Sequence, residues 1–210
     1  SGESLSLATQ KRFFEVLPQV ELHNLYGPTE AAIDVTAWKC SPLDNKTIPI
    51  GHPIANTSIH LLDRDLNEVP IGVEGDLYIG GQNLSRGYLQ RAALSAEAFI
   101  PNPLRSSESA GATSETLYRT GDRGCYRSDG AIEFLGRSDH QVKLRGNRIE
   151  LSEIETALTG SASVRQALVI LHSPKSADDQ LVAYLVLNDP PDEQFVKNPT
   201  AVLTPHLREL

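Results

Sequence analysis

Short apolar runs separated by turn-forming residues dominate the first part of the chain, and this pattern is typical of β-strands. Glycine, proline and asparagine cluster between the runs, where chain reversals are expected. One amphipathic helix is expected ahead of them over residues 4–17, which place apolar side chains at helical spacing before Pro18. The runs that predict strands are 20–25, 35–40, 58–62 and 76–79. The pattern therefore predicts a mostly β segment with short helices.

The next stretch, 101–116, is rich in proline and serine and poor in large apolar residues, so a surface loop is expected there. A hairpin is predicted after it, with strands at 124–127 and 131–135. The turn between them is Ser128-Asp129-Gly130, a sequence that favours tight reversal.

The pattern changes after Gly136. Ser152 and Glu155 have the spacing of a helix capping box, which predicts a helix over 152–159. The strands expected around this helix are a hairpin of 141–145 and 147–150 about Gly146, and two apolar runs at 168–171 and 181–187. Such a succession forms a small α+β unit. We place the boundary near Gly136–His140 and predict an α+β protein with a β-rich part at 1–136 and a small lobe at 137–210.

Composition narrows the functional classes. The chain has 210 residues, of which 40% are hydrophobic and 22% charged, as in ordinary globular proteins. Its formal net charge of -8 argues against a nucleic-acid partner. The first residues do not have the pattern of a secretory signal, so none is expected, and no apolar run approaches the roughly 18 residues that a membrane span requires. Cys40 and Cys125 match neither a metal spacing nor a disulfide framework. We therefore expect a cytoplasmic protein without a membrane partner.

The first segment whose side chains could bind a ligand or take part in a reaction follows a predicted strand and ends in a turn. It presents an aromatic ring, a hydroxyl and a carboxylate in the order Asn24-Leu25-Tyr26-Gly27-Pro28-Thr29-Glu30. An aromatic ring can stack on a nucleobase, and Mg²⁺ usually takes one or two carboxylates together with substrate phosphates. The alternative interpretation is an ordinary turn in which Thr29 caps a helix.

Two further segments carry charge. Tyr118-Arg119-Thr120-Gly121-Asp122 places a carboxylate after a glycine turn, where it could accept both ribose hydroxyls, although Gly-Asp turns are common. The stretch from Gly136 to Leu151 holds four cations in an otherwise acidic chain, namely Arg137, Lys143, Arg145 and Arg148. Alternating strand positions put Lys143 and Arg145 on one face, which favours an anion site. The alternative is a solvated hairpin face paired with Asp139 and Glu150.

A fourth segment contains several glycines, Gly75-Asp76-Leu77-Tyr78-Ile79-Gly80-Gly81 followed by Leu84-Ser85-Arg86-Gly87-Tyr88-Leu89. It lacks the spacing of a dinucleotide loop and does not open a helix, so tight turns beside a ligand site are the better interpretation. Together, and in their order along the chain, the four segments resemble the core motifs of the adenylate-forming superfamily. The full Asn-Leu-Tyr-Gly-Pro-Thr-Glu and the Gln141–Leu151 stretch resemble its nonribosomal peptide synthetase branch.

The resemblance implies an ATP-dependent ligase. In this family a carboxylate attacks the α-phosphate of Mg-ATP, and a carrier-protein phosphopantetheine thiol then takes the acyl group from the adenylate. By resemblance, Tyr26 stacks on adenine, Thr29 contacts the α-phosphate and Glu30 holds Mg²⁺. The residues expected to bind ATP are Asn24, Tyr26, Gly27, Thr29, Asp122 and Arg137. The catalytic set is expected to be Thr29, Glu30, Arg137, Asp139, Lys143 and Gly146.

The same resemblance assigns roles in domain movement and substrate choice. Asp122 would bind the ribose hydroxyls, Asp139 would act as the hinge of the small lobe, and Gly146 would line the path of the carrier arm. The pocket positions that the chain covers are Ser1, Leu25, Ile33 and Asp34, a set that resembles the serine-activating pattern. Expected partners are serine, a peptidyl carrier protein and, from the Arg91–Glu97 stretch, an MbtH-like helper protein.

Departures from the family pattern shape the remaining expectations. The family's phosphate loop is expected before residue 1 and its catalytic lysine after residue 210, so this stretch alone is expected to be inactive. One alternative is an acyl- or aryl-CoA ligase of the same superfamily. The other is a non-catalytic docking module, which the presence of Glu30, Asp122 and Arg137 argues against.

Overall fold

A computed structural model describes residues 4–44, 46–105, 115–139, 141–144, 147–173 and 179–188. The chain divides into two compact units, Ser1–Asp139 and His140–Leu210. None of the helices in the described ranges is long and apolar enough to span a bilayer. In chain order the elements are α1 (Leu7–Val16), β1 (His23–Tyr26), the 3₁₀ helix η1 (Thr29–Ala31), β2 (Thr36–Lys39), β3 (His52–Pro53), β4 (Thr57–Leu62), β5 (Gly75–Gly81), α2 (Ala92–Ala98), β6 (Phe99–Pro101), β7 (Thr116–Tyr126), β8 (Ile132–Arg137), β9 (Gln141–Leu144), β10 (Asn147–Glu150), α3 (Leu151–Thr159), β11 (Val164–His172) and β12 (Gln180–Leu187).

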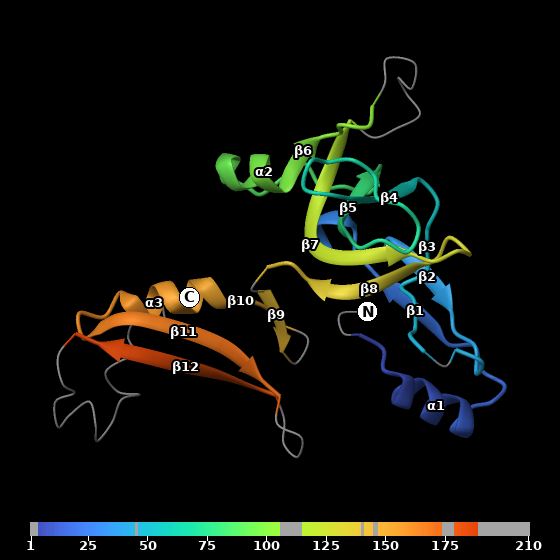
Figure 1. The fold of residues 1–210 in the computed structure, drawn as a ribbon, viewed down its shortest axis with the longest axis horizontal. Coiled ribbons are helices and arrows are strands. Elements are labelled where there is room, and N and C mark those ends of the chain that lie inside the picture. Colours follow the sequence, from blue (N-terminus) through green and yellow to red (C-terminus); the bar gives the residue numbers. More distant parts are fainter. Residues whose placement is uncertain are drawn as a thin grey trace. The chain divides into compact units, whose positions relative to one another are not determined.

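The first unit contains two antiparallel sheets, which Figure 1 shows in blue and in cyan to yellow. One has the strand order β1-β2-β3, and the other has β4-β5-β7-β6 with β8 also paired to β7. The helix predicted over 4–17 is α1, and the predicted strands of this region correspond to β1, β2, β4 and β5. Strand β1 pairs with β2 so that Tyr26 faces Thr36, and the tight turn between them holds η1.

Strand β7 is the centre of the larger sheet. Its first residues pair with β6, where Tyr118 faces Phe99, and its last residues pair with β8, where Asp122 faces Arg137. The change of neighbour occurs at Gly121, whose φ of +75° suits glycine. The sequence predicted only 124–127 as a strand here, because the polar residues of 116–123 obscure the alternation that the burial of β7 displays.

The core of the first unit lies between the sheets and is built mainly from aliphatic side chains, together with one buried tyrosine. Its fully buried members include Leu61, Leu77, Ile79, Tyr118 and Ile132. This packing makes the sheets a rigid support for the polar residues at their edges.

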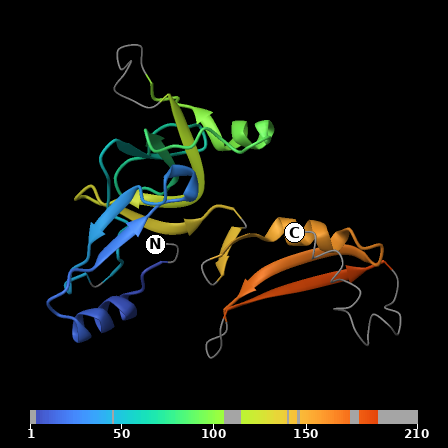
Figure 2. The same cartoon turned by 180° about the vertical axis from the view of Figure 1, so that it is seen from behind.

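Helix α2 differs from the rest of this unit because none of its residues is buried. Figure 1 and Figure 2 both show it beside β6 at the outside of the unit. Neither α2 nor β6 was predicted from the sequence, because the Ala-rich stretch lacks apolar periodicity.

The second unit has a β9–β10 hairpin, the helix α3 and a β11–β12 hairpin. Apolar residues of α3 and β11, chiefly Leu151, Leu158, Val164 and Val169, form a second core. The hairpin and helix predicted here are confirmed, but the capping box is wrong. Glu150 is the N-cap residue, and the Glu155 carboxylate accepts the backbone N–H of Val169 (2.8 Å). Glu155 therefore ties the helix to β11 instead of closing its first turn.

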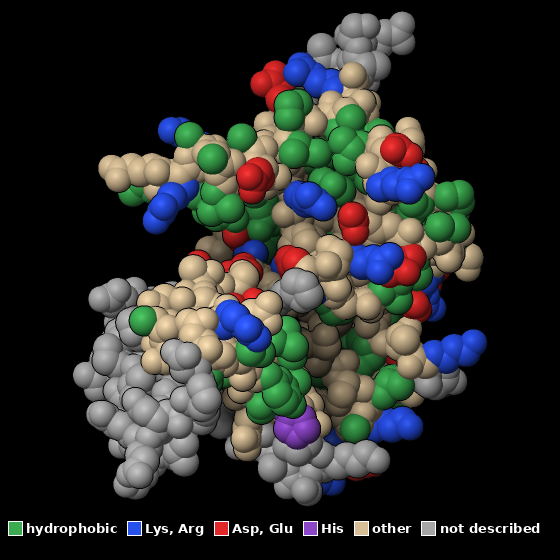
Figure 3. Space-filling model, turned by 60° about the vertical axis from the view of Figure 1, so that its left-hand side comes forward, with side chains coloured by type: hydrophobic (Ala, Val, Ile, Leu, Met, Phe, Trp, Pro, Cys, Tyr) green, Lys and Arg blue, Asp and Glu red, His purple; other side chains and the backbone are tan. Residues whose placement is uncertain are grey.

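Charged side chains of both signs lie close together on the face in Figure 3. Several arginines of the first unit form ion pairs, such as Arg123 with Glu74 (3.0 Å) and Arg127 with Asp129 (3.4 Å). These exposed pairs contribute little to stability individually, on the order of 0–1 kcal/mol.

Candidate functional site

The turn after β1 is shaped by a close approach of two backbone segments. A Cβ at Gly27 would lie 2.3 Å from the carbonyl oxygen of Ile33, so only glycine fits there. The side-chain amide of Asn24 donates to the carbonyl of Pro49 (2.8 Å) and fastens β1 to the neighbouring loop. Both residues were predicted to bind ATP, and each has a local structural role that shapes this turn.

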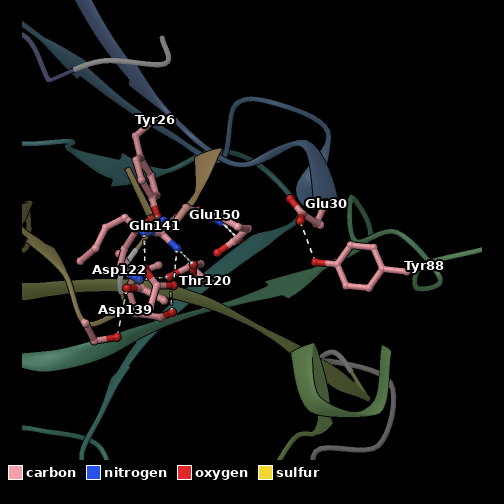
Figure 4. Close-up of polar contacts among 12 residues, drawn as sticks. Tyr26, Glu30, Tyr88, Thr120, Asp122, Asp139, Gln141 and Glu150 are labelled. Carbon is pink, nitrogen blue, oxygen red and sulfur yellow. Dashed lines mark hydrogen bonds and ion pairs between the residues drawn. The ribbon is translucent and has the colours of Figure 1, made fainter. Parts of the chain in front are cut away.

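Asp122 is the centre of a buried polar cluster, drawn in Figure 4. Its side chain is 9% exposed and accepts hydrogen bonds from the Tyr26 hydroxyl (2.5 Å) and from Arg137 Nη1 (2.7 Å). Its backbone N–H donates to the hydroxyl of Thr120 (2.9 Å), which itself donates to the Leu77 carbonyl (2.7 Å). Three predicted residues from β1, β7 and β8 are thus brought together around one carboxylate.

Arg137 extends this cluster to Asp139. Its Nε and Nη2 atoms donate to the two carboxylate oxygens of Asp139 at 2.7 Å each, and Nη2 also donates to the carbonyl of Thr120 (3.0 Å). Such a planar fork fixes geometry better than a point charge. Arg137 is 15% exposed and Asp139 44% exposed, so the pair leads from the buried Asp122 to the surface of this unit.

The electrostatics of the cluster keep Tyr26 protonated. Burial, and then the charge of Asp122, raise the pKa of the Tyr26 hydroxyl well above its ordinary value. The hydroxyl is therefore a permanent hydrogen-bond donor to Asp122 at neutral pH. The Tyr26 ring also packs against Phe134, with ring centroids 6.2 Å apart.

Glu30 lies in the same turn as Thr29, which is exposed. The hydroxyl of Tyr88 donates to Glu30 Oε1 (2.7 Å), as the right-hand side of Figure 4 shows. Burial and the bond to Glu30 raise the pKa of Tyr88 far above its ordinary value. Sequence reasoning missed this role of Tyr88, although the glycine-rich segment that contains it was singled out.

The predicted substrate residues lie on and after the same turn. Leu25 is half-buried on β1, and Ile33 is 60% exposed with a φ of +78°, an unusual conformation for a β-branched residue. Asp34 Oδ1 is buried and has no hydrogen-bond partner within the described part of the chain. Ser1 lies outside the described residues.

The remaining predicted residues belong to the second unit. Lys143 is exposed on β9 and lies opposite Arg148 of β10 in the register. Two cations at facing positions repel each other, which favours an anionic neighbour. Arg145 and Gly146 lie outside the described residues.

Among the described residues, no group of three or more histidine, cysteine, aspartate or glutamate side chains is gathered to hold a metal ion. Within η1, the carboxylate is that of Glu30. That donor set suits a hard cation shared with phosphates rather than an all-protein metal cage.

Comparison with known proteins places these features in context. Residues 1–89 match the family described as AMP-binding enzyme. Phosphinothricin tripeptide synthetase PhsB of Streptomyces viridochromogenes is 51% identical over 185 residues, which cover 88% of this chain and 15% of that protein. Tyrocidine synthase 1 of Brevibacillus parabrevis is 46% identical over 165 residues, which cover 78% of this chain and 14% of that protein.

Solved structures resemble the chain as well. IdnL1 has a TM-score of 0.80 at 28% identity, covering 95% of this chain and 40% of the other. Holo-PA1221, an NRPS protein containing adenylation and PCP domains bound to a vinylsulfonamide inhibitor, has a TM-score of 0.78 at 29% identity, covering 93% and 33%. The chain therefore spans well under half the length of the proteins it resembles.

Proposed function

We propose that this chain is the later part of a domain that activates an amino acid. Over most of its length the chain is related to nonribosomal peptide synthetases, and it has the α+β fold of their adenylation domains. In the first step the carboxylate of the amino acid displaces pyrophosphate from the α-phosphate of ATP and forms aminoacyl-AMP. In the second step the phosphopantetheine thiol of a carrier protein displaces AMP and forms a thioester. The observation that supports this most directly is the buried Asp122 carboxylate held between Tyr26 and Arg137.

The Asp122 cluster is well suited to the nucleoside half of ATP. The Arg137 guanidinium compensates the charge of the buried carboxylate, and an ionised carboxylate accepts hydrogen bonds from ribose hydroxyls. Tyr26 would stack on adenine while its hydroxyl stays fixed on Asp122 (2.5 Å). Because these groups are held in place before the nucleotide binds, little reorganisation is needed at binding.

Thr29 and Glu30 are proposed to meet the phosphates. The exposed Thr29 hydroxyl would donate to the α-phosphate, and the Glu30 carboxylate would bind the Mg²⁺ of Mg-ATP, as the donor set allows. When bound, Mg²⁺ offsets phosphate charge as the carboxylate of the amino acid attacks. The role of this chain is to hold the reacting groups in position.

The second half-reaction is assigned to the later residues. Asp139 is the proposed hinge of the small lobe. Lys143 on β9 would face the anionic carrier arm, and Gly146 is proposed to line the path of that arm. A carrier-protein domain is the implied partner, and α2, which buries none of its residues, is the proposed docking site of an MbtH-like protein.

We further propose that the activated amino acid is serine. Leu25 and Ile33 would fill the space that a larger side chain needs, and Ser1 and Asp34 would bond its hydroxyl. The buried Asp34 Oδ1 without a partner in the described chain supports this, because a hydroxyl donor would satisfy it. A site built to bond a hydroxyl can reject the analogue that lacks it by up to about 10⁴-fold.

The test is amino-acid-dependent ATP–pyrophosphate exchange by the full-length enzyme across the common amino acids. Serine is expected to support exchange, and Glu30→Ala should abolish it. Asp34→Ala should narrow the preference for serine over alanine. Asp76→Ala is the control, since Asp76 is also partly buried but faces Arg123 (3.9 Å). A clear preference for another amino acid would refute the assignment of serine, and exchange that no amino acid stimulates would refute the function.

A further inference from the structure

The segment after β5 donates three hydrogen bonds to the η1 turn. The side-chain amide of Asn83 donates to the Ala31 carbonyl (3.1 Å), and the backbone N–H of Ser85 donates to the Glu30 carbonyl (2.8 Å). The third contact differs in kind, because the Tyr88 hydroxyl donates to the Glu30 side chain (2.7 Å). The first two bonds already hold the backbone of the turn. The hydroxyl of Tyr88 therefore adds a constraint only on where the Glu30 carboxylate points.

Tyr88 is itself anchored by α2 and β6. The Ser95 hydroxyl accepts the backbone N–H of Tyr88 (2.8 Å) and lies within hydrogen-bond distance of the Arg91 carbonyl (2.8 Å). The Tyr88 ring meets Phe99 edge to face, with centroids 5.8 Å apart. Gly87 permits this approach, because its φ is +131° and a Cβ there would lie 2.8 Å from Ser95 Oγ. Because both its backbone N–H and its ring are held in place, Tyr88 can fix the orientation of the Glu30 carboxylate.

The chemistry of the bond suits a carboxylate that binds a cation. A phenol is neutral at physiological pH, so the Tyr88 hydroxyl is a hydrogen-bond donor to the Glu30 carboxylate (2.7 Å). A neutral donor orients the carboxylate without cancelling its negative charge, whereas a lysine or arginine at this place would compete with the metal. Groups that orient a metal-binding carboxylate commonly tune its affinity.

We propose that Tyr88 is a positioning residue that holds the Glu30 carboxylate in the orientation required by the divalent cation of Mg-ATP. This inference rests on the proposed function, and specifically on contact between Glu30 and that cation. It assigns a task to the glycine-rich segment that contains Tyr88, and it makes Ser95 and Gly87 indirect supports of the same orientation.

The experiment uses the full-length enzyme and the variant Tyr88→Phe, which removes the hydroxyl and keeps the ring. Tyr126→Phe is the matched control, because the Tyr126 hydroxyl donates to the Ile59 carbonyl (2.8 Å). Two quantities are measured. One is the Mg²⁺ concentration that gives half-maximal pyrophosphate exchange. The other is Mn²⁺ binding in the presence of a non-hydrolysable ATP analogue, followed by electron paramagnetic resonance of free Mn²⁺.

Tyr88→Phe should weaken cation binding about 10-fold in both measurements and leave the KM for the amino acid unchanged. Tyr126→Phe should match the wild type. Ser95→Ala, which keeps the Tyr88 hydroxyl but loosens its support, should shift cation binding in the same direction by a smaller factor, and it provides a second test if Tyr88→Phe folds poorly.

Unchanged cation binding in both Tyr88→Phe and Ser95→Ala, together with weakened binding in Glu30→Gln, would overturn the role of Tyr88 and leave the proposed function standing. Unchanged cation binding in Glu30→Gln would remove Glu30 from the metal. That result would overturn the assignment of Glu30 and this inference together.

Discussion

Replacing Gly121 by alanine should disturb the Arg137–Asp139 pair, and Gly72 offers a matched control. Both glycines have a left-handed backbone, with φ of +75° at Gly121 and +80° at Gly72. A Cβ at Gly121 would lie 2.3 Å from Asp139 Oδ2 and 2.7 Å from Arg137 Nη2, whereas one at Gly72 would meet nothing within 4 Å. Alanine is therefore expected to strain the backbone similarly at both positions, but only at Gly121 does its Cβ collide with other side chains.

The expected stability changes follow from these contacts. A residue with a Cβ in the left-handed region is strained by about 1–2 kcal/mol, and the restricted unfolded chain offsets about 0.4–1 kcal/mol of this. Gly72→Ala should therefore lower the free energy of unfolding by about 1 kcal/mol. The collision at Gly121 involves the ends of two side chains, and Asp139 is 44% exposed. Weakening that pair adds only about 0.2–1 kcal/mol, so Gly121→Ala should cost about 1–2 kcal/mol.

The functional difference should be larger than the difference in stability. Arg137 also donates to Asp122 (2.7 Å), so a displaced guanidinium disturbs the proposed ribose site. In pyrophosphate exchange by the full-length enzyme, Gly121→Ala should lower kcat/KM for ATP about 10- to 100-fold, and Gly72→Ala should leave it unchanged. Thermal unfolding of both variants checks that their midpoints differ by no more than about 4 °C. Equal kcat/KM in the two variants would refute the link from Gly121 through Arg137 to Asp122.

Three further outcomes are expected. Asp122→Asn should lower the free energy of unfolding by about 2–3 kcal/mol, measured by urea titration, because a neutral amide replaces the carboxylate that accepts from Tyr26 and Arg137; a change below about 0.5 kcal/mol would contradict the importance of that charge. Tyr26 has a raised pKa in the folded state, so its stabilising effect is complete below about pH 10 and is lost as the pH rises further. The free energy of unfolding of Tyr26→Phe should therefore fall less than that of the wild type between pH 9 and about pH 11. An equal fall in the two proteins would contradict this. Asp139→Pro should impair thioester formation more than adenylation, because a fixed φ restricts the proposed hinge. Asp139→Ala is the control, since it loses the same bonds to Arg137 but keeps backbone freedom. The same ratio of the two half-reaction rates in both variants would argue against a hinge.

Local patterns in the sequence predicted much of the architecture. Alternation and turn residues located β1, β2, β4, β5 and the β9–β10 hairpin, because each of these depends on neighbours in the chain. Residue type and order also singled out the segments that contain Tyr26, Glu30, Asp122 and Arg137. Side-chain chemistry alone marks such residues as candidates, whatever the fold around them.

The partners of these residues were decided by the tertiary structure. The hydroxyl of Tyr26 meets Asp122 across 96 residues, and that of Tyr88 meets Glu30 across 58 residues. Both contacts depend on which strands pair and in which register, and that is set by burying a common core rather than by local sequence.

The hydrogen-bond partner of Glu155 was also decided by the tertiary structure, although it lies nearer in the chain. Its spacing from Ser152 predicted a capping box, yet its carboxylate reaches the Val169 amide of β11. In a sequence, one carboxylate has several acceptable donors. Packing α3 on β11 brings one of them within 2.8 Å, and the bond forms there because a backbone N–H covered by that packing would otherwise lose its hydrogen bond to water.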